Sequence, residues 1–361
     1  MNQRAALAAK QESVATGPCV IGLDLGDKWS RYCVLNEAGT VLEEDRVRSH
    51  SEALHERFGS LPSTRIVIET GTHSPWVSRL LEGVGHSVVV ANARKLRMIY
   101  ASDRKNDRLD ARMLARLGRA DVELLAPIQH RGAKTQADLA VIRGRDSMVA
   151  ARTQLVNCCR GTVKAIGGRL PKSTTSAFAG KMKEAVPDEL QAALEPLLAS
   201  IRVLSEQIKS CDRRIRALAA QQYPETRLLQ QVQGVGPLVA LTYVLTLEDP
   251  HRFPKSRSVG SYLGLRPRQS ESGDSAPQLG ITKAGSGQLR RLLVQSSQYI
   301  LSSLAQDSRL RRWGLELASR GGKNGKKRAV IAVARKLAVL LHRLWSTGEV
   351  YEPLYRIEQT A

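Results

Sequence analysis

Four carboxylates occupy positions where an acidic side chain needs compensation. Asp24 lies within the apolar run of residues 20–26, and Glu69 closes a later apolar run. Asp107 and Asp110 are three residues apart in a segment with helical spacing, so they share one helix face. Burying an unpaired charge is costly, and a metal ion supplies the compensation. Carboxylates on two strands and one helix could hold two Mg²⁺ or Mn²⁺ ions about 3.5 to 4 Å apart, the arrangement used for in-line phosphoryl displacement.

Each of these carboxylates also has an ordinary explanation. Asp24 could cap a turn, and Glu69 could be a solvated strand end. Asp107 and Asp110 could pair with arginines on the surface of their own helix. The arginines concerned are Arg104, Arg108 and Arg112. The occurrence of all four carboxylates in the order strand, strand, helix favours one site over four separate explanations.

The charge of the chain predicts a polyanionic partner. The 361 residues include 55 Lys and Arg against 34 Asp and Glu, a formal net charge of +21. With 42% hydrophobic and 25% charged residues, the composition is otherwise that of a globular protein, which excludes wholesale disorder. Between Arg252 and Lys336 there are 18 basic and 4 acidic residues. The anion-binding surface is therefore expected in the last third of the chain.

Other features indicate a protein of a reducing compartment that does not enter membranes. The apolar stretches are shorter than the roughly 20 residues that cross a bilayer. Residues 1–18 include Gln11 and Glu12 and have no apolar core, so they predict a flexible leader and not a signal peptide. The five cysteines form no C-x-x-C pair, which favours reduced thiols. We expect a cytoplasmic, nucleoid-associated protein.

Residues 19–125 alternate strand-like and helical patterns, which predicts an α/β domain. The first three strands are separated by turns and should form a meander, and the later strands alternate with helices. The expected strands are 20–26, 31–35, 40–47, 65–69 and 88–90. The expected helices are a short one that Ser49 or Ser51 could cap and that ends at Phe58, followed by 74–83 and 107–117.

Residues 137–222 show helical spacing and one run with a seven-residue repeat. Apolar residues alternate steps of four and three through four heptads, the pattern of a coiled-coil seam. Pro196 predicts a kink, or a helix that begins at this proline. An intramolecular hairpin with the segment 139–166 and a dimeric coil fit the pattern equally well, and we expect the segment to join subunits in a dimer or tetramer. The seam consists of Leu190, Leu194, Leu197, Ile201, Leu204, Ile208, Cys211, Ile215 and Leu218.

Three motifs around the carboxylates resemble the insertion sequence 110 family of transposases, also described as bridge-RNA-guided recombinases. The motifs are Gly22-Leu23-Asp24 with the turn at 34–39, Ile68-Glu69-Thr70-Gly71-Thr72, and the segment 105–112 with its aspartate pair. The resemblance extends from Ile21 to about Val350. It implies that Asp24, Glu69, Asp107 and Asp110 are the Asp-Glu-Asp-Asp set of a RuvC-type, ribonuclease H-like domain.

The C-terminal half, residues 223–361, resembles the transposase domain of the same family. Residues 233–237, followed by an apolar run, are similar to a helix-hairpin-helix. In such a motif, Gly234 and Gly236 would expose backbone N–H groups to a phosphate. A plain corner between two helices is the alternative.

The same resemblance implies that Ser272 is the catalytic nucleophile. The residues alone do not select it from Ser270 and Ser275 in the same loop, and no histidine of the sequence is placed nearby as its base. Cations around it would stabilise a pentavalent phosphate transition state. The basic residues expected to bind nucleic acid are Arg266, Arg268, Lys283, Arg290, Arg291, Lys323, Lys326, Lys327 and Arg328. With aromatic residues at 4%, binding should be mainly electrostatic.

These observations together predict a DNA transposase or recombinase with a RuvC-type α/β domain, a coiled-coil middle and a mostly helical C-terminal domain. The resemblance implies donor and target DNA and a guide RNA as partners. One alternative is a junction-resolving nuclease that uses the carboxylates and water, with Ser272 idle. Another is a helix-hairpin-helix protein that bridges DNA without catalysis. An ATP-using protein of the actin type would share the strand around Asp24 but not Glu69 or the aspartate pair.

Overall fold

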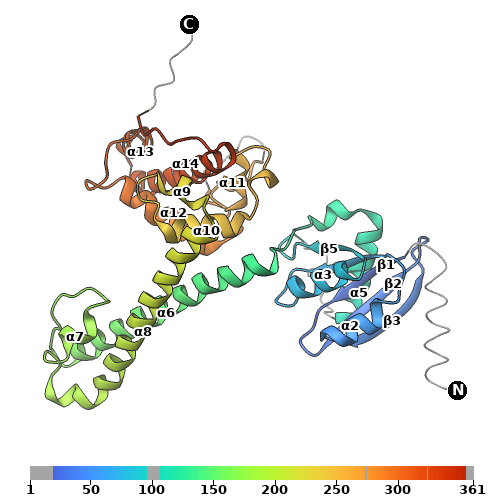
Figure 1. Cartoon of the computed structure of the whole chain (residues 1–361), viewed down its shortest axis with the longest axis horizontal. Coiled ribbons are helices and arrows are strands. Elements are labelled where there is room, and N and C mark those ends of the chain that lie inside the picture. Colours follow the sequence, from blue (N-terminus) through green and yellow to red (C-terminus); the bar gives the residue numbers. More distant parts are fainter. Residues whose placement is uncertain are drawn as a thin grey trace, which may run out of the picture. The chain divides into compact units, whose positions relative to one another are not determined.

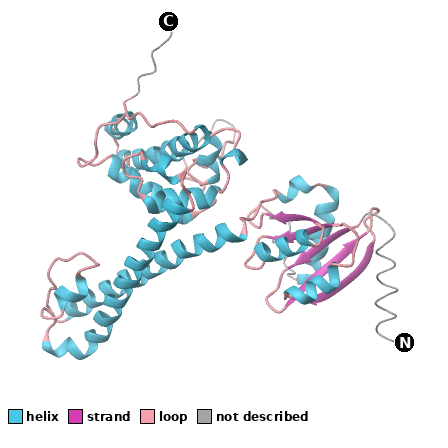
Figure 2. Ribbon diagram, in the orientation of Figure 1, coloured by secondary structure: helices cyan, strands magenta, loops and turns pink. Residues whose placement is uncertain are grey.

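The chain folds into two compact units, Met1–Arg131 and Gly132–Ala361 (Figure 1). The structure is a computed structural model that describes residues 19–95, 106–272, 275, 277, 279–322 and 324–354. The expected leader, residues 1–18, lies outside the described residues. The first unit is mixed α/β and the second is built of helices (Figure 2), which confirms the predicted α/β plus α class.

A five-stranded sheet forms the centre of the first unit. Its order is β3-β2-β1-β4-β5, in which β1, β2 and β3 are antiparallel and β4 and β5 run parallel to β1. The predicted meander and the two later strands are confirmed, with ends shifted by one or two residues. The strands are β1 (Val20–Asp24), β2 (Trp29–Leu35), β3 (Val41–Arg48), β4 (Arg65–Glu69) and β5 (Ser87–Ala91).

Helices cover both faces of this sheet, because successive side chains of each strand point to opposite faces and pack against a different helix layer on each. Leu23 and Ile68 pack with Leu54 and Leu81 of the helices α2 and α3. Val67 points to the opposite face, where it packs with α5. The helices are α2 (Ser51–Phe58), α3 (Ser74–Gly83) and α5 (Asp107–Ala120), and the 3₁₀ turn η1 (Val122–Leu125) follows α5.

Gly22 allows α5 to lie directly on β1. A Cβ atom at this position would lie 2.0 Å from the Ala111 carbonyl oxygen and 2.4 Å from the Ala115 nitrogen. Ala111 and Ala115 are fully buried and equally small. Asn106 begins the helix, because its side chain accepts a hydrogen bond from the Arg108 N–H. The first turn of α5 is therefore held close to the end of β1.

In the second unit the two long helices α6 (Ala133–Ala165) and α8 (Asp188–Gln221) pack along each other (Figure 1). Leu194 and Ile201 of the predicted seam share a core with Val156 and Val163 of α6. The short helix α7 (Phe178–Met182) closes the connection between them. α8 already begins at Asp188, so the alternative in which a helix starts at Pro196 is wrong.

The remaining helices form one core around α10 and α14. α10 is apolar on all sides, and its Tyr243 hydroxyl donates to the Ala338 carbonyl of α14 at 2.6 Å. No helix in the described part of the chain is both long and apolar enough to cross a membrane. The elements are α9 (Thr226–Gln230), α10 (Pro237–Leu247), η2 (Pro250–Arg252), α11 (Arg257–Tyr262), α12 (Gly287–Ile300), α13 (Arg309–Ser319) and α14 (Gly325–Thr347).

Candidate active site and nucleic-acid interface

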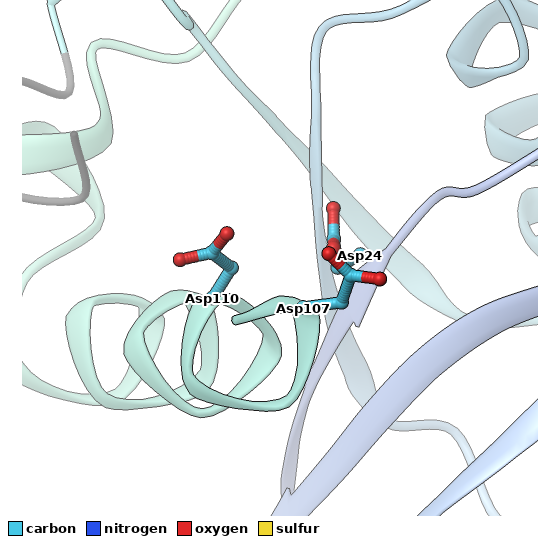
Figure 3. A group of neighbouring side chains, drawn as sticks. All are labelled: Asp24, Asp107 and Asp110. Atoms are coloured by element: carbon cyan, nitrogen blue, oxygen red, sulfur yellow. The ribbon is translucent and has the colours of Figure 1, made fainter. Parts of the chain in front are cut away.

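Three of the four predicted carboxylates come together. One carboxylate oxygen from each of Asp24, Asp107 and Asp110 lies within 4.8 Å of the others. Asp24 ends β1, and the two other residues project from the first turns of α5 (Figure 3). Asp24 and Asp110 are partly buried, whereas Asp107 is exposed. These three residues are called the carboxylate cluster below.

The geometry of the carboxylate cluster follows from the contact between β1 and α5. Asp24 is two residues after Gly22, so both point to the face that α5 covers. Asp107 lies one helical turn before Ala111, which is the residue in contact with Gly22. The close approach at Gly22 thus sets the distance between the strand end and the first turn of the helix.

Glu69 lies at the neighbouring strand end but outside this group of three. β4 is parallel to β1, with Leu23 paired to Ile68, so Asp24 and Glu69 follow at the same level of the sheet. Glu69 shares the α5 face with Val67 and is partly exposed. The structure therefore puts Glu69 at the same sheet edge and on the same face as Asp24.

Glu44 of β3 anchors α5 and was missed by the sequence analysis. Its carboxylate accepts hydrogen bonds from the Arg112 Nε at 2.6 Å and the Arg108 Nε at 2.6 Å. These charge-assisted bonds lower the pKa of Glu44 to about 2, and the bond from Arg112 has the largest effect. Arg108 and Arg112 thus bind a carboxylate of the sheet, and Arg104 lies outside the described residues.

The donors of the carboxylate cluster suit a hard divalent cation. Carboxylate oxygens are the ligands that Mg²⁺ and Mn²⁺ prefer, whereas sites for softer metals use cysteine or histidine. Among the described residues, this is the one group of three or more histidine, cysteine, aspartate or glutamate side chains whose ligand atoms lie close enough together to hold a metal ion. Asp24, Asp107 and Asp110 would hold the ion, with Glu69 at the adjacent strand end.

Ser272 lies in a short two-stranded ribbon between α11 and α12. The Arg268 N–H donates to the Gly280 carbonyl and the Thr282 N–H donates to the Arg266 carbonyl, both at 2.9 Å. Beyond these bonds, Ser272 and Ser275 exchange backbone hydrogen bonds of 3.2 and 3.1 Å. Ser272 is exposed. The predicted nucleophile is therefore an exposed residue that pairs with Ser275.

The base of this ribbon is held by backbone contacts. Gly264 has φ +67°, and a Cβ atom there would lie 2.2 Å from the Ala284 nitrogen. Lys283 adopts φ +55°, a left-handed conformation that is uncommon for a residue other than glycine. The Arg290 guanidinium donates to the carbonyls of Leu263 and Ala284 at 2.9 and 2.7 Å. Arg290, predicted as a phosphate ligand, thus also holds the ribbon in place.

The other predicted phosphate-binding cations differ in their surroundings. Arg291 forms an ion pair with Asp146 of α6. The described cations with exposed side chains near the ribbon or at the start of α14 are Arg266, Arg268, Lys283, Lys326, Lys327 and Arg328. Lys323 lies outside the described residues.

Gly234 and Gly236 lie in the turn between α9 and α10. Gly234 has φ +86°, and a Cβ atom there would lie 3.1 Å from the Tyr299 ring. Beside this turn is a hollow of about 530 Å³ whose lining includes Gln233 and Gln295. Two helices joined by a short, glycine-containing turn are therefore present at the predicted position.

The first unit contains the carboxylate cluster, and the second unit has many exposed cations. Together these features indicate a metal-using enzyme that acts on nucleic acid. Two family models narrow this class. Residues 21–167 match the DEDD transposase model of the IS110 type, and residues 226–311 match the model described as transposase IS116/IS110/IS902 family. The chain belongs to the IS110 family of transposases and is a DNA transposase.

Curated relatives agree along most of the chain. The transposase for insertion sequence element IS1111A of Coxiella burnetii is 27% identical over 346 residues, which cover 92% of this chain and 91% of the relative. The transposase for insertion sequence element IS1328 of Yersinia enterocolitica is 28% identical, with 92% and 98% covered. A DEDD transposase domain implies the use of a divalent metal, in agreement with the carboxylate cluster.

Proposed function

We propose that this transposase cuts and rejoins the DNA of an insertion sequence with two groups, a metal-bound carboxylate site and the serine Ser272. The observation that carries the proposal is the convergence of Asp24, Asp107 and Asp110 within 4.8 Å. Glu69, on the same sheet face as Asp24, completes the set of four. The bound metal would supply Lewis-acid polarisation of phosphate oxygens.

In the proposed reaction the Ser272 hydroxyl oxygen forms a bond to a DNA phosphorus atom. The bond from that phosphorus to one nucleoside oxygen breaks, the serine proton leaves, and the departing oxygen becomes a hydroxyl group. Attack of a new hydroxyl on the phosphoserine reverses these changes and frees Ser272. The number of phosphoester bonds is unchanged, so joining needs no other energy source. Arg266 and Arg268 on the same ribbon would stabilise the charge on the phosphate.

The proposal includes finer features of the fold and of the partners. The sheet order and the helix that crosses it support a RuvC-type, ribonuclease H-like domain over residues 19–125. Residues 137–222 would form the coiled-coil region, and 223–361 the transposase domain with a helix-hairpin-helix at Gly234 and Gly236. Donor and target DNA, a guide RNA and further copies of the chain are the partners we propose.

Trapping a covalent protein–DNA adduct tests the serine mechanism. Donor DNA with a radioactive label is incubated with the full-length protein, the proposed guide RNA and divalent metal, and adducts are separated on a denaturing gel. Wild-type protein should form an adduct, and Ser272→Ala should form none. This substitution removes one oxygen from an exposed side chain, so stability should change by less than about 0.5 kcal/mol.

Ser270→Ala and Ser275→Ala are the matched controls, and both should form the adduct. Loss of the adduct in one of these controls, with Ser272→Ala active, would assign the nucleophile to that neighbour. Metal-dependent cleavage without an adduct in any variant would favour the nuclease that uses water. Binding of DNA without cleavage would favour the bridging protein.

A further inference from the structure

We propose that the sheet face beside the carboxylate cluster binds an unpaired segment of nucleic acid through Trp29, Arg31, Arg46 and Arg48. These four residues of β2 and β3 are called the strand platform. The inference rests on the proposed function, because the strand platform would bind the same nucleic-acid strand whose phosphate lies at the metal site.

Cross-strand register puts the strand platform on the same face as the carboxylate cluster. Asp24 of β1 is paired with Arg31 of β2, and Arg31 is paired with Arg46 of β3. Residues directly paired in a sheet point to the same face. Gly22, two residues before Asp24, lies against Ala111 of α5, so this is the face that α5 covers. One acidic and two basic residues thus form a row across three strands.

The next row of the same face contains an exposed tryptophan. Trp29 is paired with Arg48 and lies two residues before Arg31. The guanidinium carbons of Arg46 and Arg48 lie 4.5 and 4.8 Å from the centre of the Trp29 ring. Trp29 is nevertheless 39% exposed. The strand platform therefore offers an aromatic ring and guanidinium planes to solvent.

The core of the unit does not explain this arrangement. Ser30 and Val47 alternate with the platform residues along β2 and β3 and are buried, and Val47 belongs to the core beneath α2 and α3. Trp29, Arg46 and Arg48 point to the other face. A large aromatic side chain left exposed beside cations is more characteristic of a binding surface than of a core.

The backbone around Trp29 is held in place by short connections. A Cβ atom at Gly26 would lie 2.2 Å from the Trp29 carbonyl oxygen, so the turn between β1 and β2 is tight. The Ser49 N–H donates to the Lys28 carbonyl at 3.1 Å and extends the pairing of β2 with β3. The platform is thus positioned before any ligand binds.

The chemistry of these rows matches a polynucleotide strand. Neighbouring strands are about 4.8 Å apart, so Arg31 and Arg46 lie roughly 5 and 10 Å across the sheet from the strand of Asp24. With one phosphate at the carboxylate cluster, adjacent phosphates would meet these two arginines. Trp29 and the guanidinium planes would stack on a base, which is possible where the base is unpaired.

Photocrosslinking tests the contact with Trp29. Full-length protein is irradiated with short oligonucleotides that carry 5-iodouracil, as unpaired DNA, unpaired RNA and duplex DNA, and adducts are mapped by mass spectrometry. We expect an adduct at Trp29 with an unpaired strand and little with the duplex. An adduct with DNA, with RNA or with both supports the platform and identifies the strand that uses it.

Binding measured against salt concentration separates stacking from charge. Trp29→Ala should weaken binding of the unpaired strand by roughly tenfold with no change in the salt slope, and Trp29→Phe should retain most of the affinity. Arg46→Ala should reduce the slope by about 0.7, the value for one phosphate contact on a single strand. Arg116→Ala removes the same charge from the exposed middle of α5 and should leave the slope unchanged.

The outcomes distinguish this inference from the proposed function. The platform is overturned if no adduct forms at Trp29 and if Trp29→Ala and Arg46→Ala bind like the wild type, whatever Asp110→Asn does. If Trp29→Ala weakens binding while Asp110→Asn transfers strands normally, the platform stands and the metal mechanism falls.

Discussion

Gly22 and Asp24 are two residues apart on β1, and they contribute to the carboxylate cluster in different ways. Asp24 contributes a carboxylate oxygen. Gly22 has no side chain and so allows α5 to approach, because a Cβ atom there would overlap the Ala111 carbonyl. Asp107 and Asp110 reach Asp24 through this close contact. Small residues are therefore as necessary to the site as charged ones.

Asp110→Asn should abolish metal-dependent strand transfer without unfolding the protein. Loss of a residue that merely orients a metal ligand already costs roughly 10- to 100-fold in affinity or activity. Loss of a ligand should therefore cost at least roughly 100-fold in strand transfer, together with weaker Mn²⁺ binding measured by calorimetry. Asp45→Asn, an exposed carboxylate of β3, is the control. Wild-type activity of Asp110→Asn, or in excess chelator, would contradict the metal site.

Glu44→Gln should weaken the first unit in a pH-dependent way. Because the pKa of Glu44 is lowered to about 2, its ionised form stabilises the fold above the usual glutamate pKa of about 4.3. That contribution is lost as pH falls from about 4.3 to 2. The variant should therefore be less stable by about 2 kcal/mol at pH 7, and this difference should shrink below pH of about 4.

Urea unfolding at several pH values, with the α5 peptide followed by pulse-labelling mass spectrometry, measures this difference. Glu56→Gln, an exposed residue of α2, is the matched control and should unfold like the wild type. A difference between Glu44→Gln and wild type that stays constant from pH 7 to pH 3 would contradict the role given to its charge.

The sequence predicted the aspartates of the cluster but not the residues that support them. Asp24 is conspicuous because it interrupts an apolar run, and Asp107 and Asp110 because their spacing matches a helix. Glu44 lies in a polar stretch of β3, 64 residues before Arg108. The arginine partners of Glu44 can be identified only once the register of β2 and β3 and the position of α5 are known. The contacts by which Arg290 supports the ribbon depend on tertiary structure in the same way, and its predicted binding of phosphate stays a prediction.

Among the elements, the heptad run of α8 shows what a periodic pattern leaves open. A seven-residue repeat fixes which side of a helix is apolar, but it does not say whether the partner helix belongs to the same chain. In the structure, Leu194 and Ile201 are buried against α6 of their own chain. Strands were easier to predict, because short apolar runs and the turns between them are local features, although the strand ends differed by one or two residues.

Ile201→Ala should destabilise the pair of α6 and α8. Ile201 is fully buried among Val156, Cys159 and Val163, and truncation of a buried isoleucine typically costs about 2 to 5 kcal/mol. Val203→Ala, on a side chain that is 55% exposed, is the control and should change stability by less than about 0.5 kcal/mol. Urea unfolding with light scattering measures stability and mass together. A lower mass with unchanged stability would indicate that Ile201 joins subunits.

At the scale of the whole molecule, the charge is unevenly distributed along the chain. The segment from Arg252 to Lys336 has 18 basic and 4 acidic residues, whereas the carboxylate cluster lies in the first unit. Arg291 forms an ion pair with Asp146, while the exposed cations at the start of α14 project from one helical turn. The basic residues are therefore concentrated in the last third of the chain, where we propose that DNA phosphates bind, whereas the candidate metal ligands lie in the first unit.

Neutralising the start of α14 should change the salt dependence of DNA binding. Each phosphate contact with duplex DNA contributes about 0.9 to the slope of log affinity against log salt, so the triple substitution Lys326→Ala, Lys327→Ala, Arg328→Ala should reduce the slope by up to about 2.7. The substitution Arg213→Ala, Arg214→Ala, Arg216→Ala removes the same charge from exposed positions of α8. Fluorescence anisotropy over a salt series measures both. Equal slopes for the two variants would mean that only net charge matters, whereas a smaller slope for the α14 variant alone would identify a specific phosphate contact.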